Sequence, residues 1–134
     1  DQGYDPQPDM RAWLSGTPSI LSMAAIEPGV AMIAQAGMPA VRDKSCALTA
    51  LAVDLFDEWL APQGWVLATP RDPGRRGSHV TVARADAQEV TKRLVESGVI
   101  PDFRRPDGIR LGLAPLTTRF VDVYDAMVRM AQYG

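Results

Sequence analysis

The chain has little of several residue types and patterns that mark particular classes of protein. Its 134 residues include one cysteine, Cys46, so an internal disulfide framework is excluded and a reducing, cytoplasmic setting is expected. The one histidine, His79, has no partner at metal-ligand spacing, so no metal site is expected. No apolar run approaches the roughly 20 residues that a bilayer-spanning helix needs.

The chain has no large excess of positively or negatively charged residues. The formal net charge is −2, and 22% of the residues are charged. No basic face indicates a nucleic-acid partner, and no acidic tail indicates a solvating arm. The length suffices for one domain whose core needs no disulfide to hold it. We therefore expect a globular domain with neither nucleic acid nor membrane among its partners.

The first residues have the composition of a connector. The sequence opens on Asp1 without an initiator methionine, and residues 1–16 are polar and carry Pro6 and Pro8. Such a segment is expected to be extended. Either the chain has been trimmed or it is the tail of a longer polypeptide, and we expect the second.

Hydrophobic periodicity predicts helices and strands after this connector. Thr17 is a candidate N-cap, with Pro18 at the first helical position. Pro28-Gly29 interrupts that helix, so a kink or two abutting helices are expected before Gly37. Further helices are expected at about 39–60, 86–97 and 119–132, and strands at about 65–69, 78–83, 99–104 and 109–113. Core-facing helical residues are expected at Val41, Leu48, Leu51, Ala52, Leu55, Phe56, Trp59, Val90, Leu94, Val95, Val121, Val123, Tyr124, Met127 and Met130. This order predicts an α+β fold, a mostly antiparallel sheet with helices packed on one face.

Residues 98–116 form the most informative stretch, in which two short apolar runs flank an Arg-Pro-Asp-Gly turn at 105–108. Arg110 lies inside the second run, between Ile109 and Leu111. Simple exposure to solvent does not explain an arginine in this position. Its planar fork of donors suits the bidentate capture of a carboxylate, and a strand would hold that fork rigidly. The alternatives are a pair with a buried acid such as Asp102, or a side chain that extends off an edge strand.

Gly16 and Thr17 form a second candidate site. A hydroxyl and free backbone N–H groups at a helix start suit a phosphate, and Gly16 would let the backbone come close to it. The alternative for Thr17 is an ordinary N-cap, worth about 1 kcal/mol of helix stability.

Three other features have simpler interpretations. His79 is expected on the outward face of its strand. The loop with Arg75 and Arg76 could lie at an active-site mouth, but a solvated loop is favoured. Cys46 is expected to pack rather than to act as a nucleophile.

Four segments together resemble one family: residues 16–21, 42–49, 76–80 and 99–120. In order and spacing they are similar to the carboxy-terminal part of kynureninases, which are fold-type-I pyridoxal-phosphate (PLP) enzymes. The resemblance runs from about Trp13 to the last helix. It departs from the family at Pro28 and at Thr117, where many relatives place an aromatic residue.

The resemblance implies the small C-terminal α+β domain of such an enzyme at 17–134, joined by the connector 1–16 to an absent N-terminal large domain. It implies a homodimer that hydrolyses L-kynurenine to anthranilate and L-alanine with PLP. Arg110 would bind the substrate carboxylate. Thr17, with Gly16 beside it, would contact the PLP phosphate from the neighbouring subunit.

PLP chemistry also needs a lysine, which the family carries in its large domain. Lys44 and Lys92 both fall inside predicted helices with ordinary polar neighbours. We therefore expect no catalytic residue in this chain and no activity of the chain alone. Two alternatives stay open: another fold-type-I PLP enzyme, a desulfurase or aminotransferase, and a stand-alone α+β module that binds an amino acid through Arg110.

Overall fold

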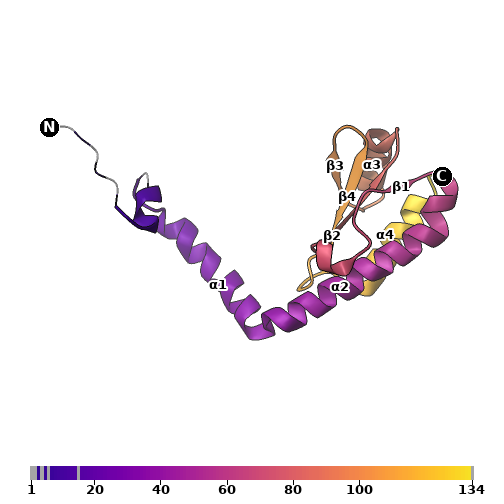
Figure 1. Ribbon diagram of the computed structural model, residues 1–134. Coiled ribbons are helices and arrows are strands. Elements are labelled where there is room, and N and C mark those ends of the chain that lie inside the picture. The colour runs from indigo at the N-terminus through magenta and orange to yellow at the C-terminus, as the bar shows by residue number, and fades with distance from the viewer. Residues whose placement is uncertain (1–2, 4, 6, 15, 134) are drawn as a thin grey trace. The chain divides into compact units, whose positions relative to one another are not determined.

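The computed structural model describes residues 3, 5, 7–14 and 16–133. By its internal contacts the chain divides into two compact units, 1–37 and 38–134. The first unit contains helix α1, and the second contains the sheet and helices α2 to α4 (Figure 1). The boundary between connector and domain that the sequence places after residue 16 stays a prediction.

The first unit consists of a short 3-10 turn, Met10–Trp13, and helix α1, Ile20–Ala36. The turn lies where the sequence predicts an extended connector, because Asp9 caps it by accepting a hydrogen bond from the Arg11 backbone N–H at 2.9 Å. Helix α1 continues through Pro28 as one element, so the predicted pair of helices is not formed. Gly37 ends it with a φ of 78°, a conformation that favours glycine.

Ser19, not Thr17, is the N-cap of α1. The Ser22 backbone N–H donates to Ser19 Oγ at 3.4 Å, and the two hydroxyls lie 3.0 Å apart. The prediction for Thr17 as N-cap is wrong because a residue before proline is biased towards extended backbone, which delays the helix beyond Pro18. The Thr17 hydroxyl therefore has no part in capping.

No single helix of the described residues is long and apolar enough to cross a membrane. Helix α1 and the helix that follows it meet the length and hydropathy requirements only when they are taken together across the break between them.

The second unit begins with helix α2, Met38–Leu55, which continues as a π-helical turn, Phe56–Leu60. Strands β1, Val66–Leu67, and β2, His79–Ala83, follow, and then helix α3, Ala87–Glu96. A hairpin of β3, Asp102–Arg104, and β4, Gly108–Gly112, leads to helix α4, Phe120–Ala131. Each predicted helix and strand of this unit is confirmed, although β1 and β3 are shorter than predicted.

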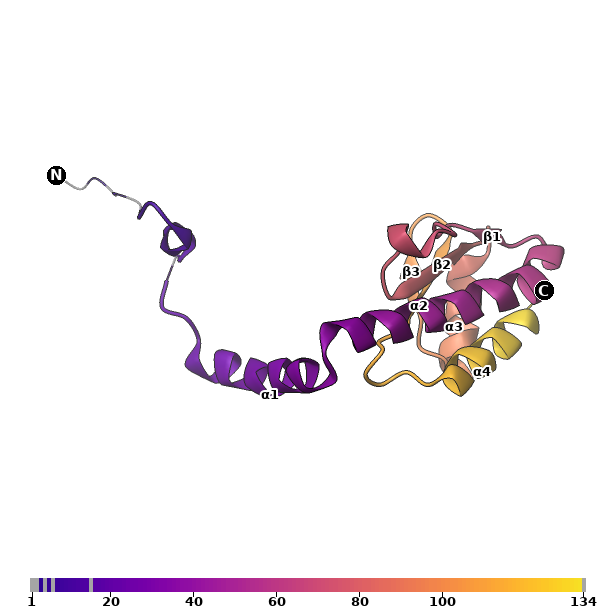
Figure 2. The same cartoon turned by 60° about the horizontal axis from the view of Figure 1, so that its bottom comes forward.

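The four strands described in this unit form one antiparallel sheet in the order β1-β2-β4-β3. The register pairs Val80 with Leu111 and Val82 with Ile109, and all four side chains are buried. Because side chains alternate along a strand, these residues define the inner face of the sheet. Helices α2 and α3 contact the strands, and α4 lies alongside α2 in both ribbon views (Figures 1 and 2). The α+β prediction is confirmed.

The helices complete the core with apolar stripes at helical spacing. The buried residues that they contribute include Leu48, Ala52, Leu55, Phe56, Val90, Leu94, Val123, Met127 and Met130. The predictions for Val95, Val121 and Tyr124 are wrong, since these side chains are exposed. A helix face of limited width packs into the core, and each of the three lies within two positions of a buried residue but is rotated out of that face.

Candidate functional site

Arg110 lies in the middle of β4, on the face of the sheet opposite the core. The register places it across from Thr81 on β2 and across from Asp102 on β3. Arg104 follows Asp102 by two residues and so lies on the same face. We call Asp102, Arg104 and Arg110 the outer-face cluster.

A glycine keeps this face uncrowded. A Cβ at Gly108 would lie 3.1 Å from the Arg104 carbonyl oxygen and 3.3 Å from the Arg104 Cβ. It would also lie 3.5 Å from Cγ2 of Thr81. Gly108 therefore lets β3 and β2 approach β4 closely beside Arg110.

Within the outer-face cluster, both arginines form ion pairs with the same carboxylate oxygen of Asp102. Arg110 Nη2 donates to Asp102 Oδ2 at 2.6 Å, and Arg104 Nη2 lies 2.5 Å from the same oxygen. The side chains of Arg110, Asp102 and Arg104 are 35%, 48% and 52% exposed. The predicted pair between Arg110 and Asp102 is thus present, but the acid is half-exposed rather than buried. Exposed ion pairs contribute roughly 0.2–1 kcal/mol each.

Residues 71–75 and 77 are exposed, as a solvated loop predicts, but Arg76 is half-buried and bonded to the protein, so the prediction is wrong for this residue. Its Nε donates to Thr49 Oγ1 at 3.0 Å, and its Nη1 donates to the carbonyls of Pro70, at 3.4 Å, and Arg71. Arg75, by contrast, is exposed. The Arg76 guanidinium therefore ties the 70–77 loop to helix α2.

Two further contacts hold the same loop against α2. Arg42 donates to the Arg76 carbonyl at 3.2 Å and also to the Pro73 carbonyl. The hydroxyls of Ser45 and Ser78 lie 2.7 Å apart. Since Ser78 directly precedes β2, these contacts fix the start of the strand that carries Thr81 beside Arg110.

The remaining candidates agree with their simpler interpretations. His79 is exposed at the start of β2, on the outer face of the sheet, as predicted. Cys46 is a free, half-buried thiol on α2. No three His, Cys, Asp or Glu side chains of the described residues come together in a way that could hold a metal ion.

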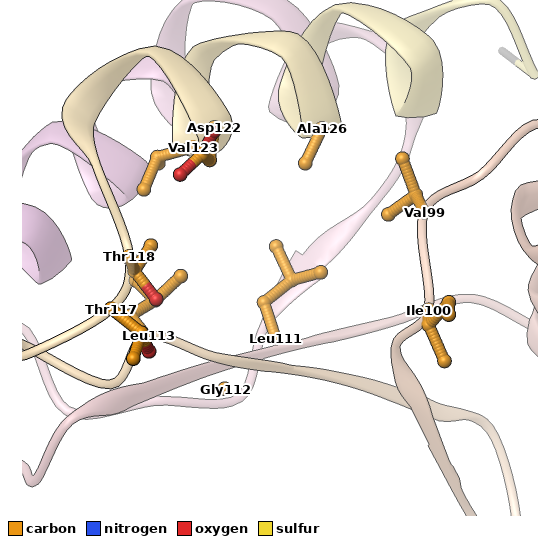
Figure 3. A pocket seen from close by; sticks show the side chains of 10 residues that line it. All are labelled: Val99, Ile100, Leu111, Gly112, Leu113, Thr117, Thr118, Asp122, Val123 and Ala126. Carbon is orange, nitrogen blue, oxygen red and sulfur yellow. The ribbon is translucent and has the colours of Figure 1, made fainter.

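A cavity of about 230 Å³ lies on the inner side of the sheet, between β4 and the start of α4 (Figure 3). Its lining is mostly apolar, with Leu111, Val123, Ala126 and Val99 around one space. Hydroxyls of Thr117 and Thr118 and the Asp122 carboxylate add polar groups. Leu111 faces this cavity whereas its neighbour Arg110 faces the other side of the sheet, so the cavity and the outer-face cluster are separate.

The carboxylates with resolved pKa shifts are all held by arginines. Hydrogen bonds from the Arg119 side chain and backbone lower the pKa of Asp122, whose carboxylate accepts from the Arg119 backbone N–H at the start of α4. A side-chain hydrogen bond from Arg71 lowers the pKa of Asp57 in the same way. Neither acid is poised to exchange a proton near neutral pH.

Gly16 and Thr17 belong to the first unit, whereas Arg110 belongs to the second. Both residues are exposed, and nothing lies within 4 Å of a Cβ built on Gly16. The Thr17 hydroxyl and the Gly16 backbone are therefore both accessible from outside the chain. The two lysines of the chain, Lys44 and Lys92, do not line the cavity, and Lys92 pairs with Glu89 at 3.6 Å.

Sequence reasoning named Arg110 and Asp102 but missed Arg104. The signal was present in the hairpin: residues two apart on a strand share a face, so an acid at 102 opposite Arg110 brings the side chain at 104 alongside. The anchoring roles of Arg42 and Thr49 had no local signal, because their partners lie some 30 residues away.

These features define a class: a small α+β domain whose outer sheet face carries Arg104 and Arg110 paired with Asp102. Residues 41–130 match the family described as the kynureninase C-terminal domain. This match covers more than half of the chain, and the chain belongs to that family.

Individual kynureninases agree with this assignment. The chain is 39% identical over 124 residues to kynureninase from Pseudomonas fluorescens. It is 42% identical over 124 residues to the kynureninases from Burkholderia mallei (strain SAVP1) and Burkholderia pseudomallei (strain K96243). Each alignment covers 92% of this chain and 30% of the relative. The chain therefore spans less than a third of the length of these relatives.

Proposed function

We propose that this chain is the C-terminal part of a kynureninase, an enzyme that hydrolyses L-kynurenine to anthranilate and L-alanine with PLP. The family match supports the enzyme class. The observation that carries the proposal is the place of Arg110, on the second strand from one edge of the sheet and on the face opposite the buried residues Ile109 and Leu111.

Arg110 binds and orients the substrate in this proposal. Its guanidinium suits the α-carboxylate of an amino acid because two parallel N–H groups match two carboxylate oxygens. The backbone of β4 is bonded to β2 on one side and to β3 on the other, so the arginine is held in place before the substrate arrives. Loss of such a bidentate pair costs about 2–4 kcal/mol of binding.

The cofactor is proposed to be held mainly by parts of the enzyme outside this chain. When bound, PLP supplies an electron sink for cleavage of the substrate Cβ–Cγ bond. From this chain, the Thr17 hydroxyl and the Gly16 backbone would hold its phosphate, both from the neighbouring subunit of a homodimer. The chain alone is expected to be inactive because its two lysines lie inside helices and do not line the cavity.

The exposed apolar surface of helix α1 is evidence for a further, large domain. Within its own unit no residue of α1 is buried, and Ile20 and Leu21 are 78% and 85% exposed. Apolar surface of this extent marks an interface. We propose that the N-terminal large domain of the enzyme covers it, in a cytoplasmic homodimer.

Replacement of Arg110 in the complete enzyme tests the proposal. Arg110→Ala is expected to lower kcat/KM for L-kynurenine by about 30-fold or more. Arg110→Lys keeps the charge without the fork and should recover only part of this loss. Release of the fluorescent product anthranilate is the assay.

Three outcomes would contradict the proposal. An unchanged kcat/KM in Arg110→Ala would show that Arg110 does not bind the substrate carboxylate. Desulfuration or transamination without anthranilate would favour another fold-type-I PLP enzyme. Binding of an amino acid by this chain alone, with no larger enzyme formed, would favour the stand-alone module.

A further inference from the structure

The outer-face cluster contains more than the arginine that binds substrate. Asp102 Oδ2 lies 2.6 Å from Arg110 Nη2 and 2.5 Å from Arg104 Nη2. One acid therefore holds two arginines, and both contacts use a single oxygen. This arrangement can control where the Arg110 guanidinium points.

The contact with Asp102 leaves Arg110 able to bind a second carboxylate. A guanidinium has five N–H donors in a fixed plane, and each of its two paired edges includes one N–H of Nη2. Asp102 accepts from Nη2 alone among the Arg110 nitrogens. Whichever Nη2 proton is used, the other edge keeps its two parallel N–H groups. Asp102 therefore restrains the Nη2 end of the guanidinium without occupying its whole fork.

Arg104 offsets the charge that Asp102 brings to this face. Asp102 with Arg110 alone would be neutral and would attract an anion only weakly. With Arg104 added the cluster carries a net charge of +1, which suits one carboxylate. Because Arg104 contacts the Asp102 oxygen, its influence on Arg110 passes through Asp102.

We propose that Asp102 is a positioning residue for Arg110, and that Arg104 balances the Asp102 charge so that the aligned guanidinium still attracts the substrate carboxylate. This inference deepens the function proposed above and rests on it. Neither residue touches the reacting atoms, so both act on substrate binding rather than on bond cleavage.

The cluster is not needed to hold the sheet together. All three side chains are on the outer face and at least 35% exposed. The hairpin is fixed by the backbone register of β3 and β4 and by Phe103, which packs against the core on the inner face. An isosteric change at Asp102 is therefore expected to leave the fold intact.

The test uses the complete, PLP-loaded enzyme and compares KM with kcat for L-kynurenine. Asp102→Asn is expected to raise KM about fivefold, with kcat within about twofold of the unchanged enzyme. Arg104→Ala should raise KM to a similar degree, and Arg104→Lys should restore it. In the Asp102→Asn background Arg104 has no carboxylate charge to balance, so Arg104→Ala should raise KM less than it does beside an intact Asp102.

The control is Asp57→Asn, which breaks the exposed pair of Asp57 with Arg71, at 2.6 and 2.7 Å, on the π-helical turn. It should change neither constant. An unchanged or lower KM in Asp102→Asn, or independent effects of the two cluster variants, would overturn the inference.

The two proposals fail in different ways. If the unchanged enzyme releases no anthranilate, the proposed function fails and this inference fails with it. If the unchanged enzyme is active and Arg110→Ala impairs it, whereas Asp102→Asn does not alter KM, only the positioning role is wrong.

Discussion

Arg76 and its neighbour Arg75 offer a matched pair for measuring what the 70–77 loop contributes to stability. The Arg76 guanidinium donates to Thr49 Oγ1 at 3.0 Å and to the carbonyls of Pro70 and Arg71. Arg75 is exposed and forms no such network within the described residues. The change to be made is Arg76→Ala, with Arg75→Ala as its control.

The magnitude follows from these contacts. Three hydrogen bonds from a charged donor contribute about 1 kcal/mol each, or about 3 kcal/mol together. Release of the ordered arginine side chain returns about 1–2 kcal/mol of conformational entropy. Thr49 keeps its own donor bond to the Ser45 carbonyl at 2.9 Å, so no buried donor is left without a partner. Arg76→Ala should therefore lower the free energy of unfolding by about 1–2 kcal/mol, and Arg75→Ala by less than about 0.5 kcal/mol.

Urea unfolding followed by circular dichroism measures both variants. If the slope of the unfolding free energy against urea is unchanged, the shift in midpoint reports the loss of stability directly. Equal midpoints for Arg76→Ala and Arg75→Ala would refute the conclusion that Arg76 anchors the loop. A large effect of Arg75→Ala would refute it as well.

Two other predictions concern a helix cap and a carboxylate. Ser19→Ala should destabilise α1 by about 1 kcal/mol and reduce the helical circular dichroism signal of the chain, whereas Thr17→Ala should leave that signal unchanged. The same Thr17→Ala change in the complete enzyme should weaken PLP binding, and an equal loss of helix in both variants would contradict the Ser19 cap. Because Arg119 lowers the pKa of Asp122 in the folded chain, this pair stabilises the fold above the ordinary aspartate pKa, and the contribution is lost as pH falls through the lowered value. Asp122→Asn should accordingly make the urea midpoint less dependent on pH between about pH 5 and pH 2, and an identical pH dependence in both proteins would argue against the pair.

Local periodicity was sufficient to predict the elements of the second unit. The stripe of Leu48, Ala52 and Phe56 and the alternation through Val80 and Val82 depend only on neighbouring residues, and both reappear as buried faces. The start of α1 was harder to predict because two capping residues, Thr17 and Ser19, stand on either side of a proline. Only the hydrogen bond to Ser22 distinguishes them.

Contacts between distant segments could not be predicted in this way. Arg76 carries the same side chain as Arg75, and no local pattern shows which of the two turns toward Thr49, 27 residues away. That choice depends on how the loop packs against α2. Residue type alone therefore could not show that Arg76 connects this loop to helix α2.

The position of Asp102 beside Arg110 decides between the explanations that the sequence leaves for this arginine. The sequence left three explanations: capture of a substrate carboxylate, a pair with a buried acid such as Asp102, or a side chain that extends off an edge strand. Because β4 is an inner strand, the choice is between the first two. The register places Asp102 directly across from Arg110, and their contact at 2.6 Å uses a single nitrogen of the guanidinium. Since a full edge of two N–H groups remains, the pair with Asp102 does not compete with a bound carboxylate. The two explanations are compatible, and the acid becomes a reason why the arginine is already aligned when a substrate arrives.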